Sequence, residues 1–103
     1  MIKAVICKDG QVTVKEIENS FNSILQYVGP EAVEFYPFSD KEIAAVMSPE
    51  TDEFSEIWSL TDGEIFFGPA IFIHADPFNP EYESLTDKDL EFLQRTIKVR
   101  PGL

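Results

Sequence analysis

The feature that most constrains the fold is an almost uninterrupted apolar segment in the second half of the chain. Residues 70–75 read AIFIHA, with His74 as their one strongly polar member. A short apolar run of this kind, bounded by turn-forming residues, is typical of a buried strand. Gly68 and Pro69 precede it. Because proline has no N–H group to donate within a sheet, this dipeptide marks a bulge, a bend or a strand start. We therefore predict a sheet that buries residues 70–75.

The first seventeen residues predict a β-hairpin. Residues 2–7 are apolar apart from Lys3, and apolar side chains alternate with polar ones over residues 12–17. Gly10 lies in the connecting turn, where it tolerates the positive φ angles that tight hairpins require. Further strands are predicted at residues 33–36 and 43–47, residues 48–55 read as an acidic loop, and residues 56–60 form either an edge strand or an extended connection.

Two helices are also predicted. Residues 21–28 place apolar side chains on one face, after an N-cap at Asn19 or Ser20 and before a Gly-Pro stop. Thr86 is a second N-cap, and Asp89 three residues later gives a pattern like a capping box. The apolar face of this second helix consists of Leu90, Leu93 and Ile97.

These elements predict one α+β domain over residues 1–103. We expect an antiparallel or mixed sheet of about five strands with two helices packed on one face. A chain of 103 residues supports a single core of moderate stability and is too short for two separate cores. The oligomeric state stays open.

The charge of the chain is strongly acidic and unevenly distributed. The formal net charge is −11, and residues 16–87 alone carry −15, whereas each end of the sequence carries +2. This balance disfavours a direct hold on nucleic-acid phosphates or on anionic membrane surfaces. The sequence has no apolar run near the ~20 residues of a membrane span and no signal-peptide pattern. Its single cysteine allows no internal disulfide, and we expect a cytoplasmic protein.

The side chains that usually carry catalysis or metals are scarce. One histidine and one cysteine do not make a structural zinc site, and no acidic segment matches a calcium loop. Cys7 lies in a predicted apolar strand, where burial lowers thiol reactivity unless His74 lies close by. We interpret His74 as a hydrogen-bonded residue at the rim of the core. We predict a non-catalytic protein without a cofactor or metal.

Acidic and aromatic side chains gather in the predicted loops and connections. Exposed aromatic anchors within a polar rim concentrate binding energy in protein interfaces. The alternative is that these aromatic residues cover the open end of the sheet. The candidate partner-binding residues are Glu50, Asp52, Glu53, Phe54, Glu56, Trp58, Asp76, Phe78, Glu81, Tyr82 and Glu83.

Four segments of the chain carry a family resemblance. They are Met1–Ile6, Val14–Asn19, Gly68–Ile73 and Ser84–Leu90. Together they resemble a family of small domains of unknown function found in bacteria, phages and other mobile elements. The resemblance spans nearly the whole chain, but its motifs are strands, turns and caps and imply no catalytic residue. It implies a small intracellular accessory protein of a phage or mobile element.

Charge and resemblance together favour a binding protein. The leading hypothesis is an acidic inhibitor or decoy of a basic, nucleic-acid-binding host protein, such as a nuclease or anti-phage effector. An alternative is a small-ligand or nucleotide-binding module that sequesters a signal, using Lys3, Lys41, His74 or Arg95. A third possibility is a soluble accessory domain of unknown function whose acidic residues only maintain solubility.

Overall fold

The computed structural model describes residues 1–39, 41–49, 56–60, 63, 65–79 and 81–99, with Glu56 and Val99 described by their backbone alone. It is an α+β structure with antiparallel sheets. The larger sheet begins with the predicted hairpin, formed by β1 (Ile2–Lys8) and β2 (Gln11–Ile17). The turn has positive φ at Asp9 (54°) and Gly10 (74°), which matches the turn type that two-residue hairpins favour. The hairpin prediction is confirmed.

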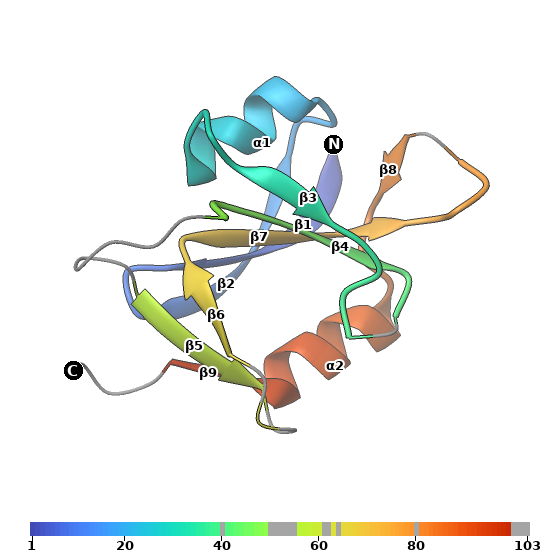
Figure 1. Cartoon of the computed structure of the whole chain (residues 1–103). Helices are drawn as coiled ribbons and strands as arrows, with labels where there is room; N and C mark the ends of the chain where they lie inside the picture. The colour runs from blue at the N-terminus through green and yellow to red at the C-terminus, as the bar shows by residue number, and fades with distance from the viewer. Residues whose placement is uncertain (40, 50–55, 61–62, 64, 80, 100–103) are drawn as a thin grey trace.

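The predicted buried strand is the centre of this sheet. β7 (Ala70–Ala75) pairs with β1 on one side and β4 (Ile43–Met47) on the other (Figure 1). The strand order is β2-β1-β7-β4-β3, in which β3 (Val33–Phe35) forms one edge. A short strand that the sequence did not predict, β8 (Tyr82–Glu83), pairs with the end of β7. The connection between β7 and β8 therefore projects beyond the sheet.

A second, three-stranded sheet makes the prediction of about five strands too low, since the described residues contain nine strands. Its order is β6 (Ile65–Gly68), β5 (Glu56–Leu60) and β9 (Ile97–Val99). Residues 56–60 thus form a central strand, not an edge or a connection. Pro69 separates β6 from β7, so the predicted break in the apolar stretch is the point where the chain leaves one sheet for the other. Residues 50–55 of the predicted acidic loop lie outside the described residues.

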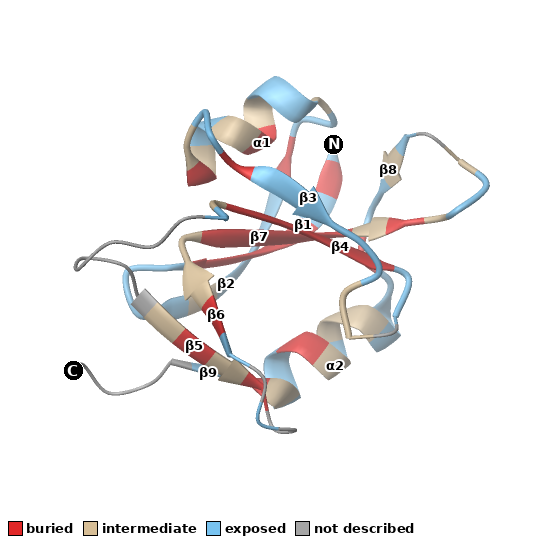
Figure 2. Cartoon of the chain, in the orientation of Figure 1, coloured by how far each residue is buried: buried red, intermediate tan, exposed pale blue. Residues whose placement is uncertain are grey.

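The two helices lie on opposite faces of the larger sheet, which corrects the prediction of a single covered face (Figures 1 and 2). α1 (Phe21–Val28) contributes Ile24 and Val28 to one buried cluster. α2 (Asp87–Thr96) contributes Leu93 to the other cluster, which also contains side chains of the second sheet. The central strands explain this arrangement. β4 is buried at every position, so its alternating side chains require cover on both faces.

The start of α2 is fixed by the predicted capping box. Thr86 Oγ1 accepts a hydrogen bond from the Asp89 N–H at 3.1 Å, and Asp89 Oδ2 accepts from the Thr86 N–H at 2.9 Å. Both acidic residues of the first turn, Asp87 and Asp89, favour the positive end of the helix dipole. The helix ends one residue before Ile97, which was predicted to continue its apolar face and instead begins β9.

Substitution of Thr86 tests this cap. We expect Thr86→Ala to lower the free energy of unfolding by about 1 kcal/mol, because it removes the oxygen that satisfies an unpaired helical N–H. Thr86→Ser retains that oxygen and should stay close to the wild type. Urea unfolding followed by circular dichroism measures both variants. Equal stability of the alanine and serine variants would contradict a capping role.

Candidate functional site

The candidate partner-binding residues fall into three groups. Glu50, Asp52, Glu53 and Phe54 lie outside the described residues, and of Glu56 only the backbone position in β5 is described. Trp58 was predicted to be an exposed anchor, and this is wrong: its side chain is 0% exposed. It faces the core between the two sheets because β5 is a central strand and not a loop. The remaining candidates, Asp76, Phe78, Glu81, Tyr82 and Glu83, all belong to the β7–β8 connection or to β8.

The β7–β8 connection holds a phenylalanine in solvent. Phe78 is 95% exposed, more than any other large hydrophobic residue described. Its N–H donates to Asp76 Oδ1 at 2.8 Å, and the Glu81 N–H donates to Asn79 Oδ1 at 3.0 Å. Side-chain to backbone bonds of this kind define the turns that Asp and Asn favour. The local sequence therefore shapes the connection while leaving the Phe78 ring uncovered.

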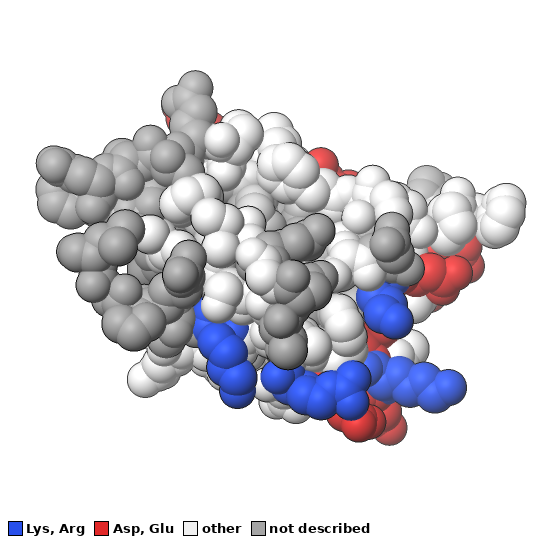
Figure 3. Space-filling model, turned by 60° about the horizontal axis from the view of Figure 1, so that its bottom comes forward, with Lys and Arg blue, Asp and Glu red and all other residues white. Residues whose placement is uncertain are grey.

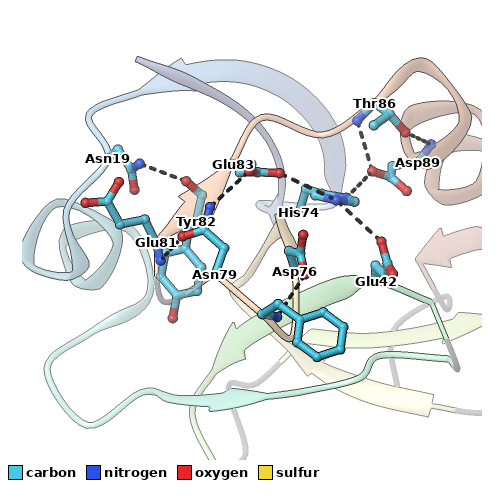
Figure 4. A network of polar contacts seen from close by, with 11 residues as sticks. Asn19, Glu42, His74, Asp76, Asn79, Glu81, Tyr82, Glu83, Thr86 and Asp89 are labelled. Carbon is cyan, nitrogen blue, oxygen red and sulfur yellow. Dashed lines mark hydrogen bonds and ion pairs between the residues drawn. The ribbon is translucent and has the colours of Figure 1, made fainter.

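Tyr82 anchors the base of this connection (Figure 4). Its hydroxyl donates to Glu34 Oε2, and its carbonyl oxygen accepts from Asn19 Nδ2 at 2.8 Å. Burial raises the pKa of the Tyr82 hydroxyl, and the hydrogen bond to the Glu34 carboxylate raises it further. Tyr82 is half-buried, packed against the α1 side of the core. It therefore acts as a support for the connection more than as an exposed anchor.

Carboxylates from several elements lie at the same end of the larger sheet as Phe78. Asp76, Glu81 and Glu83 come from the connection and β8, Glu34 comes from β3, and Glu42 comes from the start of β4. Tyr36 lines a hollow together with Glu34 and Asp76. Desolvation, followed by the charges of Glu42 and Asp76, raises the pKa of its hydroxyl. We call this surface the acidic end. It consists of Glu34, Tyr36, Glu42, Asp76, Phe78, Glu81 and Glu83.

His74 lies at the junction of β7, β8 and α2. Its Nδ1 is 2.9 Å from Asp89 Oδ2, so the oxygen that caps α2 also holds the imidazole ring. Its Nε2 faces Glu42 Oε2 at 3.7 Å and Glu83 Oε2 at 3.8 Å. The side chains of His74 and Asp89 are both 14% exposed. The prediction of a hydrogen-bonded histidine at the rim of the core is confirmed.

A nucleophilic pair of Cys7 with His74 does not form. Cys7 is fully buried and lies opposite Ala70 in the β1–β7 ladder. His74 is four residues farther along β7, about 13 Å away at the rise of a strand. The described residues also contain no group of three or more His, Cys, Asp and Glu side chains placed to hold a metal ion.

A hollow of about 370 Å³ lies beside His74, between the start of β4 and the first turns of α2. It brings together two of the four residues proposed for a small-ligand site, Lys41 and His74. Lys3 does not line it, and Arg95 lies farther along α2. Sequence reasoning missed Lys88 and Phe92, which line the hollow together with Glu42, Ile43, Thr86 and Asp89.

Sequence reasoning also missed Glu34, Tyr36 and Glu42 as parts of the acidic end. These residues precede the β7–β8 connection by some forty positions. Only the pairing of β3 with β4 and of β4 with β7 brings them to it. No local motif signals that proximity.

Comparisons of the chain with models of known protein families, with curated proteins and with solved structures found no match. Among the described residues, neither helix has the length and apolar character required to cross a membrane.

Proposed function

We propose that the acidic end binds a basic surface of a partner protein without catalysing a reaction. The observation that carries this proposal is the 95% exposure of Phe78 at the end of the sheet that also carries the five carboxylates of the acidic end. A large apolar side chain gains free energy when a partner removes it from water. An aromatic anchor with a charged rim combines that gain with selection by charge.

The charge of the acidic end identifies the class of partner. Its five carboxylates come from four separate segments of the chain. Among the described residues, no lysine or arginine forms an ion pair with any of these five carboxylates. Lysine and arginine side chains of a partner would neutralise this excess, and long-range attraction would accelerate their approach. Proteins that bind nucleic acid carry such basic surfaces.

The resemblance to domains of phages and mobile elements adds a role to this chemistry. A protein that occupies the nucleic-acid-binding surface of a host nuclease or anti-phage effector acts as an inhibitor or decoy. The hydrogen-bonded turns around Phe78 support this role, since a backbone already held by Asp76 and Asn79 loses less conformational entropy on binding.

A capture experiment with matched variants tests the proposed function. Wild type, Phe78→Ser and Ile65→Ser are immobilised and exposed to bacterial lysate, and bound proteins are quantified by mass spectrometry. Ile65 is 49% exposed on β6, outside the acidic end. We expect basic proteins that wild type and Ile65→Ser capture to fall roughly tenfold on Phe78→Ser, the loss typical of an anchor residue.

Charge reversal supplies the second comparison. Glu81→Lys should weaken capture, whereas Glu16→Lys, the same change on β2, should not. Raising the salt concentration should release the captured protein, because screening weakens attraction between charged surfaces. Equal capture by all variants, or release that is insensitive to salt, would contradict the proposal.

A further inference from the structure

Cationic side chains gather on the face of the molecule that carries α2 (Figure 3). Lys88 and Arg95 are seven residues apart on this helix, and two turns place them on one side of it. Lys41 precedes β4, and Lys98 lies in β9. All four side chains are exposed. Among the described residues, the one ion-pair partner of Arg95 is the exposed Glu91 at 3.8 Å, and such pairs hold a side chain weakly. Three of the eight Lys and Arg residues of a chain with net charge −11, Lys41, Lys88 and Arg95, therefore lie on α2 or beside its first turns.

The hollow beside His74 lies at one end of the cationic face. Lys41 and Lys88 line it, and Phe92 provides an aromatic wall. Lys41 Nζ is 5.2 Å from the centroid of the Phe92 ring, so an ammonium group and a ring face are already side by side. Ile43 is the other apolar lining residue, and Thr86 adds a hydroxyl. These groups offer positive charge and a flat apolar surface within one site.

The two carboxylates of the hollow are turned toward His74. Asp89 Oδ2 contacts the imidazole and the Thr86 N–H, and Glu42 Oε2 is 3.7 Å from His74 Nε2. Neither carboxylate pairs with Lys41 or Lys88 among the described contacts. The ammonium groups of both lysines are therefore available to an anion.

We propose that this hollow binds a mononucleotide. Lys41 and Lys88 pair with its phosphate, since ammonium groups form strong charge-assisted hydrogen bonds with phosphate oxygens. Phe92 contacts the base, because every base has a face that stacks on an aromatic ring. The volume of about 370 Å³ falls within the range of small-molecule sites.

The net charge of the protein favours a free mononucleotide over a longer nucleic-acid strand as the ligand. A longer strand would carry its remaining phosphates across a protein of net charge −11, and most of that charge lies outside the cationic face. A compact ligand needs only the two lysines. The hollow shares Glu42 with the acidic end, but Lys41, Lys88 and Phe92 belong to the hollow alone. Variants at these three residues therefore test nucleotide binding without changing Phe78 or Glu81.

Titration with AMP, followed by NMR chemical shifts of the full chain, tests the proposal. We expect shifts confined to residues 41–43, 74 and 86–92. Lys41→Ala with Lys88→Ala should weaken AMP binding more than tenfold, as loss of charged hydrogen bonds implies. The control Lys8→Ala with Lys15→Ala removes the same charge from the β1–β2 hairpin and should leave the affinity for AMP unchanged.

Two further ligands and one further variant separate the sources of affinity. Phe92→Leu should weaken AMP while leaving inorganic phosphate unaffected, because only the base contacts the ring. A ten-residue oligothymidylate should bind more weakly than AMP. The proposal is wrong if AMP at millimolar concentration shifts no resonance of residues 41–43, 74 and 86–92. It is also wrong if the oligonucleotide binds more tightly than AMP, or if the two double lysine variants weaken AMP binding equally.

Discussion

Replacing Trp58 by alanine is expected to lower the free energy of unfolding by about 3–5 kcal/mol, the range for truncating a buried large aromatic side chain. Trp58 is fully buried, and its ring stacks on Phe66 with an interplanar angle of 7° and a centroid separation of 6.2 Å. It fills the space between the two sheets, and neighbouring strands cannot collapse into the cavity that alanine leaves. Because native domains are stable by only about 5–15 kcal/mol, this loss would leave little margin.

Urea unfolding followed by far-ultraviolet circular dichroism measures this loss without relying on tryptophan fluorescence. Phe78→Ala is the matched control, since both residues were predicted to be exposed anchors. Removing the ring of Phe78, which is 95% exposed, should change stability by less than about 0.5 kcal/mol. Similar stability for Trp58→Ala and the wild type would show that the indole does not occupy the core.

Gly68→Ala is expected to cost about 3 kcal/mol, near the upper end for overpacking a close-packed core. A Cβ atom at Gly68 would lie 2.5 Å from Trp58 Nε1 and 3.4 Å from the Cys7 carbonyl oxygen. The indole cannot move aside, because it is enclosed on all sides. Trp58 Nε1 has no hydrogen-bond partner among the described residues. The contact between Gly68 and the indole is therefore a packing contact and not a hydrogen bond.

The double variant Gly68→Ala with Trp58→Ala identifies the cause. An alanine at position 58 lacks both indole atoms that meet the new methyl group, so the two substitutions together should cost at least about 1 kcal/mol less than their sum. The same denaturation measurements provide all four stabilities. Strict additivity would show that Gly68→Ala disturbs something other than Trp58.

Local chemistry explains which elements were predictable from sequence. The predicted turn and caps depend on contacts within a few residues. Gly10 adopts the positive φ of the hairpin turn, and Ser20 and Thr86 accept hydrogen bonds from N–H groups three residues later. β9 was missed because Ile97 continues the helical spacing of Leu90 and Leu93, although its β-branched side chain also suits a strand. The spacing of apolar residues did not distinguish a longer helix from a new strand at Ile97.

Arrangement in space was harder to predict. The amphipathic pattern of a helix shows that one face is buried but not which side of a sheet it covers. Residues 56–60 were predicted to be an edge strand or an extended connection, with Trp58 as a candidate exposed anchor, whereas this strand is central in the second sheet. The acidic end combines residues of the β7–β8 connection with residues of β3 and of the segment before β4. These segments are far apart in the sequence, and strand pairing brings them together.

The pairing of β1 with β7 has a consequence for synthesis on the ribosome. β1 and β2 emerge early and can form their hairpin at once, but the other edge of β1 pairs with residues 70–72. An exposed strand edge is a template for pairing with other chains. Nascent chains that have not yet reached β7 therefore expose the edge of β1 that β7 covers in the finished sheet, together with the apolar side chains of β1. We expect chaperones that hold unfinished chains to engage the protein in that interval and to release it once β7 has been added.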